Sequence, residues 1–275
     1  MVMAFLATSV GLKIPILFWL PLGVMAGLSL RGDQVEISPK LRLPAQFVLI
    51  GILVIGIGAG IYQDIPRVLV ASFWIVFIVG TANFFNFMDG INGIAAISGV
   101  VGFGLLAFET YKDQPEIGLL ATFMALACLG FLPFNLPRAQ VFMGDVGSIL
   151  LGGVFAGLVY LASHTLLDFL CMTSFLFLFY IDEITTMIIR LCDGENLTQP
   201  HRRHIYQLLA NERQIPHWRV STGYGIFQLL VGVSVLLNRK YGVGNVLAVL
   251  TVWLIIFLLC NNFIRAKDYH GNRLS

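Results

Sequence analysis

The stretch Asn83-Phe-Phe-Asn86-Phe-Met-Asp89-Gly-Ile-Asn92-Gly93 interrupts a chain that is otherwise apolar enough to lie in lipid. It falls at the end of one apolar run and just before the next. Unpaired polar groups cost several kcal/mol in hydrocarbon, so such a cluster asks for an explanation. Asn83 and Asn86 are one helical turn apart, and the glycines permit a tight turn after Asp89. We interpret the stretch as a site at a membrane boundary; the alternative is an ordinary helix end, with Asn92 capping the next helix.

The composition of the whole chain is that of an integral membrane protein. The 275 residues are 57% hydrophobic and 12% charged, against about 25% charged in soluble domains. The mean hydropathy is +0.85. A net charge of +2 gives no reason to expect a nucleic-acid partner. The four cysteines have no motif spacing, so we predict neither disulfides nor a cysteine metal site.

Apolar runs set the predicted fold. A helix needs roughly 20 residues to cross the hydrocarbon core. The sequence therefore predicts one all-α membrane domain over residues 1–275, a polytopic bundle of about nine transmembrane helices. Residues 1–11 are also apolar and would form the stub of a further helix. The nine runs cover residues 12–30, 43–62, 67–86, 93–110, 116–134, 146–163, 166–190, 220–238 and 243–264.

Basic residues predict the orientation of these spans. Alternation places residues 31–42, 87–92, 135–145 and 191–219, together with the C-terminal tail, on one side. Most of the 17 Lys and Arg residues lie there. The positive-inside rule makes this side cytoplasmic. All the polar clusters considered as sites therefore share the cytoplasmic face.

A second polar cluster, Asn135-Leu-Pro-Arg-Ala-Gln-Val-Phe-Met-Gly-Asp145-Val-Gly-Ser148, ends where the next span begins. An acidic residue at a helix N-terminus is favoured by the helix dipole, which is the structural alternative. Carboxylate and amide oxygens are also ligands for Mg²⁺, which takes one or two carboxylates and completes its shell with phosphate and water. Asp145 and Asp89 are therefore candidate ligands of Mg²⁺ (or Mn²⁺).

The third cluster is Pro200-His201-Arg202-Arg203-His204-Ile-Tyr206-Gln207. Arginine gives forked donors and histidine a titratable one, a combination that suits a diphosphate. A zinc site with His201 and His204, or a basic segment at lipid headgroups, are the alternatives.

Other charges lie near the expected spans. Asp33 and Glu36 follow the first span, either as solvated charges or as part of a site. Asp182 and Glu183 lie in or near the seventh span. Ionisable residues in spans are candidates for function, although a structural partnership of Asp182 with Arg190, two turns along one face, is equally open.

Together with Ile37-Ser-Pro-Lys-Leu-Arg42-Leu, the three clusters resemble the polyprenyl-phosphate sugar-1-phosphate transferases, the glycosyltransferase 4 family. The resemblance covers about residues 12–264. Tyr206-Gln207 looks most like the O-antigen-initiating branch. Members of the family usually begin with two further helices, which have no counterpart in this sequence.

The resemblance implies a Mg²⁺-dependent reaction at the cytoplasmic face of the bacterial inner (plasma) membrane. The phosphate of undecaprenyl phosphate, or another polyprenyl phosphate, attacks the β-phosphate of a UDP-N-acetyl amino sugar, and UMP leaves. This step starts the synthesis of a cell-surface polysaccharide such as O-antigen or lipopolysaccharide, and a homodimer is compatible with it. By resemblance Asp33, Asp89 and Asp145 are catalytic, with Asp145 and Asp89 on the metal. The implied substrate-binding residues are Asn83, Asn86, Asn92, Asn135, His201, Arg202, Arg203 and His204.

Two positions depart from the family pattern. Gly32-Asp33 stands where relatives carry an adjacent Asp-Asp pair, and Asn92 stands where many carry Asp. An inactive paralogue that binds lipid carrier or scaffolds a partner is therefore the first alternative. A transporter or flippase is the second. Internal repeats and acidic residues near the middle of spans would mark it, whereas no repeat is seen and the charges gather at one face.

Overall fold

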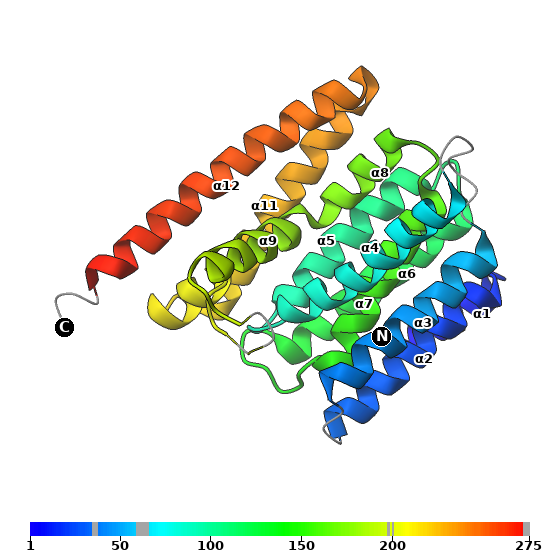
Figure 1. Cartoon of the computed structure of the whole chain (residues 1–275), viewed down its shortest axis with the longest axis horizontal. Coiled ribbons are helices and arrows are strands. Elements are labelled where there is room, and N and C mark those ends of the chain that lie inside the picture. Colours follow the sequence, from blue (N-terminus) through cyan, green and yellow to red (C-terminus); the bar gives the residue numbers. More distant parts are fainter. Residues whose placement is uncertain (35–37, 59–65, 197–198, 200, 272–275) are drawn as a thin grey trace.

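The computed structural model describes residues 1–34, 38–58, 66–196, 199 and 201–271, and no strand occurs among them. Glu36, Pro200, Arg273 and the end of the second predicted span (59–62) lie outside these residues. Seven helices in the described part are long and apolar enough to cross a membrane. The prediction of an all-α polytopic membrane bundle is confirmed (Figure 1). The seven are α2 (Ile16–Gln34), α3 (Pro39–Ile57), α4 (Arg67–Phe87), α6 (Pro115–Asn135), α7 (Gly144–Ala162), α11 (His217–Asn238) and α12 (Val243–Gly271).

The count of nine spans is not confirmed in the described part of the chain. Helix α5 (Ile94–Thr110) has 17 residues, which reach about 26 Å, short of a core about 30 Å thick. The run at 166–190 is not one helix but α8 (Leu166–Thr173), the 3₁₀ turn η1 (Ser174–Leu176) and α9 (Phe177–Cys192). The N-terminal residues form a separate short helix, α1 (Val2–Gly11).

A side chain from α11 explains why the run at 166–190 breaks. Gln228 accepts a hydrogen bond from the N–H of Leu178 at 2.9 Å and donates one to the carbonyl of Ser174 at 2.8 Å. Backbone groups freed by a helix break must find partners when water is absent. The buried carboxamide of Gln228 supplies both a donor and an acceptor, so the break is held by tertiary contacts.

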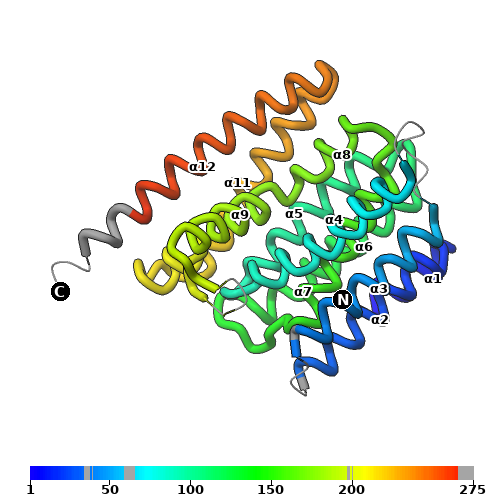
Figure 2. The backbone as a smooth tube through the Cα atoms, in the orientation of Figure 1, coloured from blue at the N-terminus to red at the C-terminus, as the bar shows by residue number. Residues whose placement is uncertain are grey.

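Helix α7 lies at the centre of the bundle. Its span is 83% buried, against 11% for α12. A Cβ on Gly152 would lie 2.7 Å from the Cα of Ala82, so only glycine lets α7 approach α4 this closely. Figure 2 follows α1–α3 along one flank and α11–α12 along the other. The start of α7 is thus held in the middle of the molecule.

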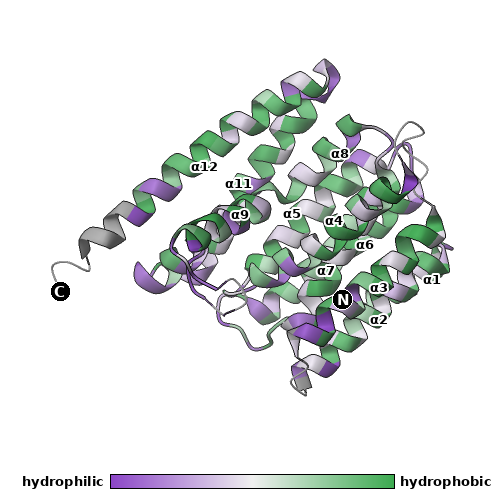
Figure 3. Ribbon diagram, viewed as in Figure 1, coloured by the Kyte–Doolittle hydropathy of each residue, from purple (hydrophilic) through white to green (hydrophobic). Residues whose placement is uncertain are grey.

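The polar segments predicted to share one membrane side do gather at one end. The hydroxyl of Tyr206 donates a hydrogen bond to the carbonyl of Phe87, and the N–H of Gly93 donates one to the side chain of Asn135. The side chain of Arg265 donates one to the carbonyl of Arg203. Gln114 and His164, predicted for the opposite side, contact each other. Figure 3 shows hydrophilic residues at helix ends and connecting segments, with hydrophobic residues along the helices. The grouping of the segments is therefore confirmed.

Candidate active site

A cavity of about 280 Å³ opens at this end of the bundle. It lies between the end of α4, the turn after it, the loop that follows α6 and the first turn of α7. Its walls are largely polar. Asn86, Asp89, Asn92, Asn135 and Asp145 line it, so five of the residues predicted from sequence meet in one place.

Side chains from two other helices meet the carboxylate of Asp145 at this cavity. Its Oδ1 accepts a hydrogen bond from Asn86 Nδ2 at 2.8 Å, and its Oδ2 forms an ion pair with Arg42 near the start of α3. Asn86 Nδ2 also donates to Ser148 Oγ at 2.9 Å. Helices α3, α4 and α7 therefore fix the position of one carboxylate at the cavity wall.

Asp33 contacts the start of the same helix through backbone groups. Its carboxylate accepts hydrogen bonds from the backbone N–H groups of Asp145 and Val146, each at 3.3 Å. An acidic side chain at a helix N-terminus stabilises the helix by about 1 kcal/mol. Gly144 makes this contact feasible, because its φ is +66° and a Cβ would lie 2.7 Å from Asp33 Oδ2. Asp33 thus holds the start of α7 and does not line the cavity.

The carboxylate of Asp89 has a different environment. Within the described part of the chain no side chain or backbone group donates a hydrogen bond to it. Burial, and then the negative charge of Asp145, raise its pKa from 3.8 to about 7. A carboxylate that accepts no hydrogen bond and lies near a second carboxylate is stabilised in its charged form by a bound cation.

The donor set of this cavity fits a magnesium ion. Two carboxylates are close enough for one to raise the pKa of the other, and amide oxygens surround them. Mg²⁺ takes one or two carboxylates from protein and completes its shell with phosphate oxygens and water. Zinc sites in proteins take three or four His, Cys or acidic ligands, and no cluster of three or more such residues occurs in the described part.

Two asparagines hold the loops around the cavity. Asn135 accepts from the N–H of Gly93 at 2.5 Å and donates to the carbonyl of Val141 at 2.9 Å, which ties the turn after α4 to the loop before α7. The backbone of Asn92 is held by α11, since its N–H donates to His217 Nδ1 and its carbonyl accepts from Ser221. Asn92 and Asn135 therefore shape the site besides lining it.

Asn83 lies one turn before Asn86 and outside the cavity. Its Nδ2 donates to Gln46 Oε1 at 2.7 Å and to the carbonyl of Val79 at 2.8 Å. Asn83 therefore links α3 and α4, and its role in substrate binding stays a prediction.

The third motif packs beside the cavity but does not line it. His204 is 1% exposed, with Nε2 at 3.2 Å from Glu183 and Nδ1 at 3.7 Å from Asp182. Burial, followed by the nearby His204 and Arg190, lowers the pKa of His201 to about 4, so this ring is neutral at pH 7. Both rings lie outside the cavity that Asp89 and Asp145 line, and that of His204 faces α9. The contact of these histidines with a diphosphate stays a prediction.

The two arginines of this motif, Arg202 and Arg203, have different surroundings. Arg203 forms ion pairs with Asp193 at 2.6 Å and with Glu195 at 2.5 Å. Arg202 is exposed. Arg190 bonds to Glu195 at 2.9 Å and not to Asp182, so the pairing considered along one face of α9 is wrong. Arg202 is thus the basic residue of the motif that is turned to the surface.

Several residues of the site escaped the sequence reasoning. Arg42 and Ser148 stood inside quoted motifs, yet nothing local marked them as partners of Asp145 and Asn86. His217 and Ser221 lie far along the chain from Asn92. In the sequence, these two residues are marked only as polar residues at the beginning of an apolar run.

Gly32 offers a test of the departure from the family pattern. A Cβ here meets no atom within 4 Å, so an aspartate fits without strain. We expect Gly32→Asp to keep or raise activity, since it restores a second carboxylate beside Asp33 at the α7 N-terminus. Initial transfer rates of the two proteins in the same membranes measure this, with Gly32→Ala as the uncharged control. A clear loss in the aspartate variant alone would mean that this loop has lost its role in the family.

Comparison with known proteins agrees with the geometry. The family model described as Glycosyl transferase family 4 matches residues 15–163, more than half of the chain. Phospho-N-acetylmuramoyl-pentapeptide-transferase of Staphylococcus saprophyticus is 33% identical over 180 residues, which are 62% of this chain and 55% of the relative. The transferase of the same name from Staphylococcus aureus is 35% identical over 179 residues, 62% of this chain and 54% of the relative.

A shorter match has a higher sequence identity. The transferase of that name from Staphylococcus epidermidis is 46% identical over 95 residues, 34% of this chain and 30% of the relative. The chain spans about half the length, or less, of the curated relatives it matches. These relatives are named for phospho-N-acetylmuramoyl-pentapeptide, so they give no support to the O-antigen and lipopolysaccharide assignment. The third motif lies beyond the residues that the family model matches.

Proposed function

Because the chain belongs to glycosyl transferase family 4, we propose that it transfers a sugar 1-phosphate from a UDP-linked N-acetyl amino sugar to a polyprenyl phosphate. The observation that carries this proposal is the pair of carboxylates, Asp89 and Asp145, in one polar cavity at the end of a membrane bundle. The predicted orientation makes this end cytoplasmic, where a soluble nucleotide and a lipid phosphate can meet.

The residues of the cavity suit the charges of such a reaction. An oxygen of the lipid phosphate forms a bond to the β-phosphorus of the nucleotide sugar while the bond to UMP breaks, so a new diphosphate forms and UMP leaves. Bound Mg²⁺ would neutralise the phosphate oxygens, with Asp145 and Asp89 as its protein ligands. Arg42 and Asn86 orient Asp145, and Asp33 fixes the turn that bears it. The protein's own part is mostly positioning and charge stabilisation.

An apolar cavity beside α4 supports a lipid acceptor. It measures about 480 Å³ and lies between α4 and the broken segment α8–α9. Phe77, Gly80 and Phe84 line it from one face of α4, the helix that carries Asn86 at its polar end. A polyprenyl chain on this face would bring its phosphate to the level of Asp89.

Two different nucleotide sugars are supported as the donor substrate, each by a different observation. The names of the relatives favour UDP-N-acetylmuramoyl-pentapeptide, the cell-wall donor. Tyr206-Gln207 favours the O-antigen branch, which uses a simple UDP-N-acetylhexosamine. The relatives match a larger part of the chain than this dipeptide does, so we take the cell-wall donor as the first candidate.

Transfer to undecaprenyl phosphate in detergent tests this assignment. Radiolabelled UDP-N-acetylmuramoyl-pentapeptide and UDP-N-acetylglucosamine are offered in parallel, with Mg²⁺ and with EDTA. We expect Mg²⁺-dependent label in the lipid extract from the first donor. Label from the second donor alone would favour the O-antigen branch. No lipid-linked label from either donor, with UDP-GalNAc and a 6-deoxy sugar added to the set, would support the inactive scaffold instead.

A further inference from the structure

A buried polar chain through α9 and α11 reaches the turn that bears Asp89. It begins at Asp182, which is fully buried. Its Oδ2 accepts a hydrogen bond from the hydroxyl of Tyr224 at 2.7 Å, and its Oδ1 accepts one from the N–H of Ile205 at 3.1 Å. Ile205 begins the short helix α10 (Ile205–Gln207). Asp182 therefore anchors the start of α10 from a different helix, in a setting where loss of a partner is costly.

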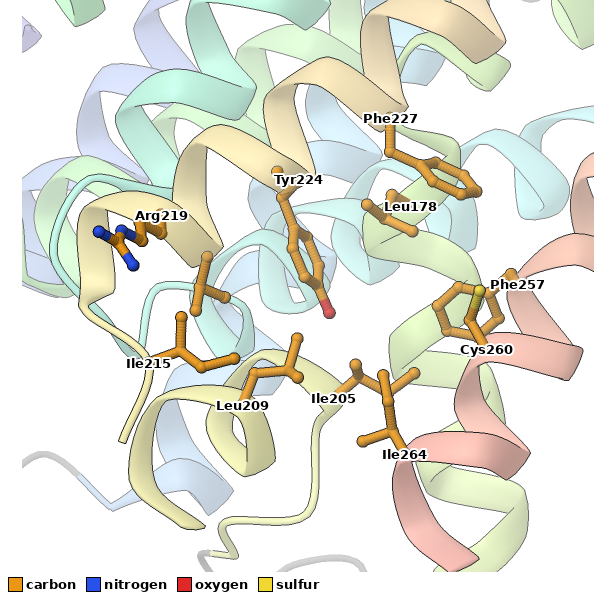
Figure 4. Close-up of a pocket in the computed structure, with 12 residues that line it drawn as sticks. Leu178, Ile205, Leu209, Ile215, Arg219, Tyr224, Phe227, Phe257, Cys260 and Ile264 are labelled. Carbon is orange, nitrogen blue, oxygen red and sulfur yellow. The ribbon is translucent and has the colours of Figure 1, made fainter. Parts of the chain in front are cut away.

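Tyr206, the next residue, carries this anchor to the active site. Its side chain is fully buried, stacks on His204 with ring centres 5.5 Å apart, and meets Tyr224 edge-on at 6.3 Å. Its hydroxyl donates to the carbonyl of Phe87 at 2.9 Å. Phe87 ends α4, two residues before Asp89. In Figure 4 the hydroxyl of Tyr224 points from α11 towards Leu209 and towards Ile205, the residue at which α10 begins.

The turn itself is shaped to receive this tyrosine. A Cβ on Gly90 would lie 2.2 Å from the Tyr206 hydroxyl oxygen, so any other residue would push the ring away. Asn135 and α11 hold the far side of the turn through Gly93 and Asn92. Tyr206 holds the side of the turn that follows Phe87. This side carries Asp89, the carboxylate of the cavity to which no described residue donates a hydrogen bond.

We propose that Tyr206, anchored through Asp182 and Tyr224, is a positioning residue that fixes the Asp89 carboxylate in the cavity. Phenylalanine would fill the same apolar space, so burial alone does not require the hydroxyl. The hydroxyl makes its hydrogen bond to the end of α4, and that bond closes the turn. The catalytic part of this proposal rests on the proposed function, whereas the contact between the two loops does not.

The variant Tyr206→Phe tests this proposal in the intact 275-residue chain in nanodiscs. Tyr160→Phe is the matched control, because Tyr160 is also buried and its hydroxyl also donates to a carbonyl, that of Val54 at 3.2 Å, away from the cavity. In hydrogen–deuterium exchange, Tyr206→Phe should speed exchange across residues 88–93 by about fivefold, the loss of one hydrogen bond. Tyr160→Phe should leave exchange there unchanged.

Kinetics add a readout that a purely structural role would not move. Tyr206→Phe should lower kcat by about tenfold and raise the Mg²⁺ concentration for half-maximal rate, while KM for the nucleotide sugar holds. Unchanged exchange at residues 88–93, or faster exchange with unchanged kcat and Mg²⁺ response, would overturn the proposal. If the wild-type chain transfers no sugar phosphate yet exchange responds as expected, the contact stands and the proposed function fails.

Discussion

Asp145→Asn is expected to abolish transfer while the protein still folds. The substitution keeps the shape of the side chain and leaves an oxygen for Asn86, but it removes the charge that Arg42 and a bound cation both need. Charge stabilisation by a metal is worth several kcal/mol, so the rate should fall by about 10³-fold or more. Initial rates of label transfer into the lipid extract measure it, at matched protein levels.

A control variant separates this effect from a general loss of charge. Asp113 is exposed in the turn between α5 and α6, at the other end of the bundle. Asp113→Asn makes the same chemical change and should transfer at the wild-type rate. The ion pair of Asp145 with Arg42 is partly exposed, and such pairs contribute about 1 kcal/mol or less. The midpoint of thermal inactivation should therefore shift little, and wild-type transfer by Asp145→Asn would refute the metal assignment.

Asp89→Asn is expected to lower the rate by about 10²-fold or more, through the loss of the second carboxylate. The effect on stability should have the opposite sign. Asp89 accepts no hydrogen bond in the described part of the chain, and the charge of Asp145 opposes its ionisation. Removal of this repulsion should hold or raise the inactivation midpoint by a few degrees.

This combination distinguishes a functional carboxylate from a structural one. A residue kept for stability would lose both activity and thermal resistance when substituted. Asp168, which caps α8 and bonds to Arg239, is the matched structural case: Asp168→Asn should lower the inactivation midpoint. If Asp89→Asn were instead less stable than wild type and still active, Asp89 would belong to the fold and the metal site would need other ligands.

Local sequence patterns predicted most of the long helices of this protein. Apolar runs predicted most helices within a few residues, for example 116–134 against Pro115–Asn135. The run at 166–190 was the exception, because the hydrogen bonds that stabilise its break come from Gln228, 50 residues away from Leu178 in sequence. Hydropathy averages over a window and contains no information about such a partner.

The candidate site divides in the same way. Motifs and the alternation of spans predicted that Asn86, Asp89, Asn92, Asn135 and Asp145 would share one end of the bundle, and all five line one cavity. The same motifs could not tell that His204 would turn inwards to Glu183 or that Asp33 would accept the N–H groups at the start of α7. Those orientations depend on which helix lies beside each loop.

The stretch that begins at Asn83 illustrates the boundary between the two. By itself the sequence determined that this is a membrane protein, that a helix ends near Phe87, and that polar atoms collect there, since composition and periodicity act over neighbouring residues. Only the tertiary structure decided which partners those atoms take: Arg42 for Asp145 and Tyr206 for Phe87, pairs separated by 103 and 119 residues. In a bundle with little water, most polar groups take partners from the elements packed against them, and those neighbours are set by the packing of the whole chain.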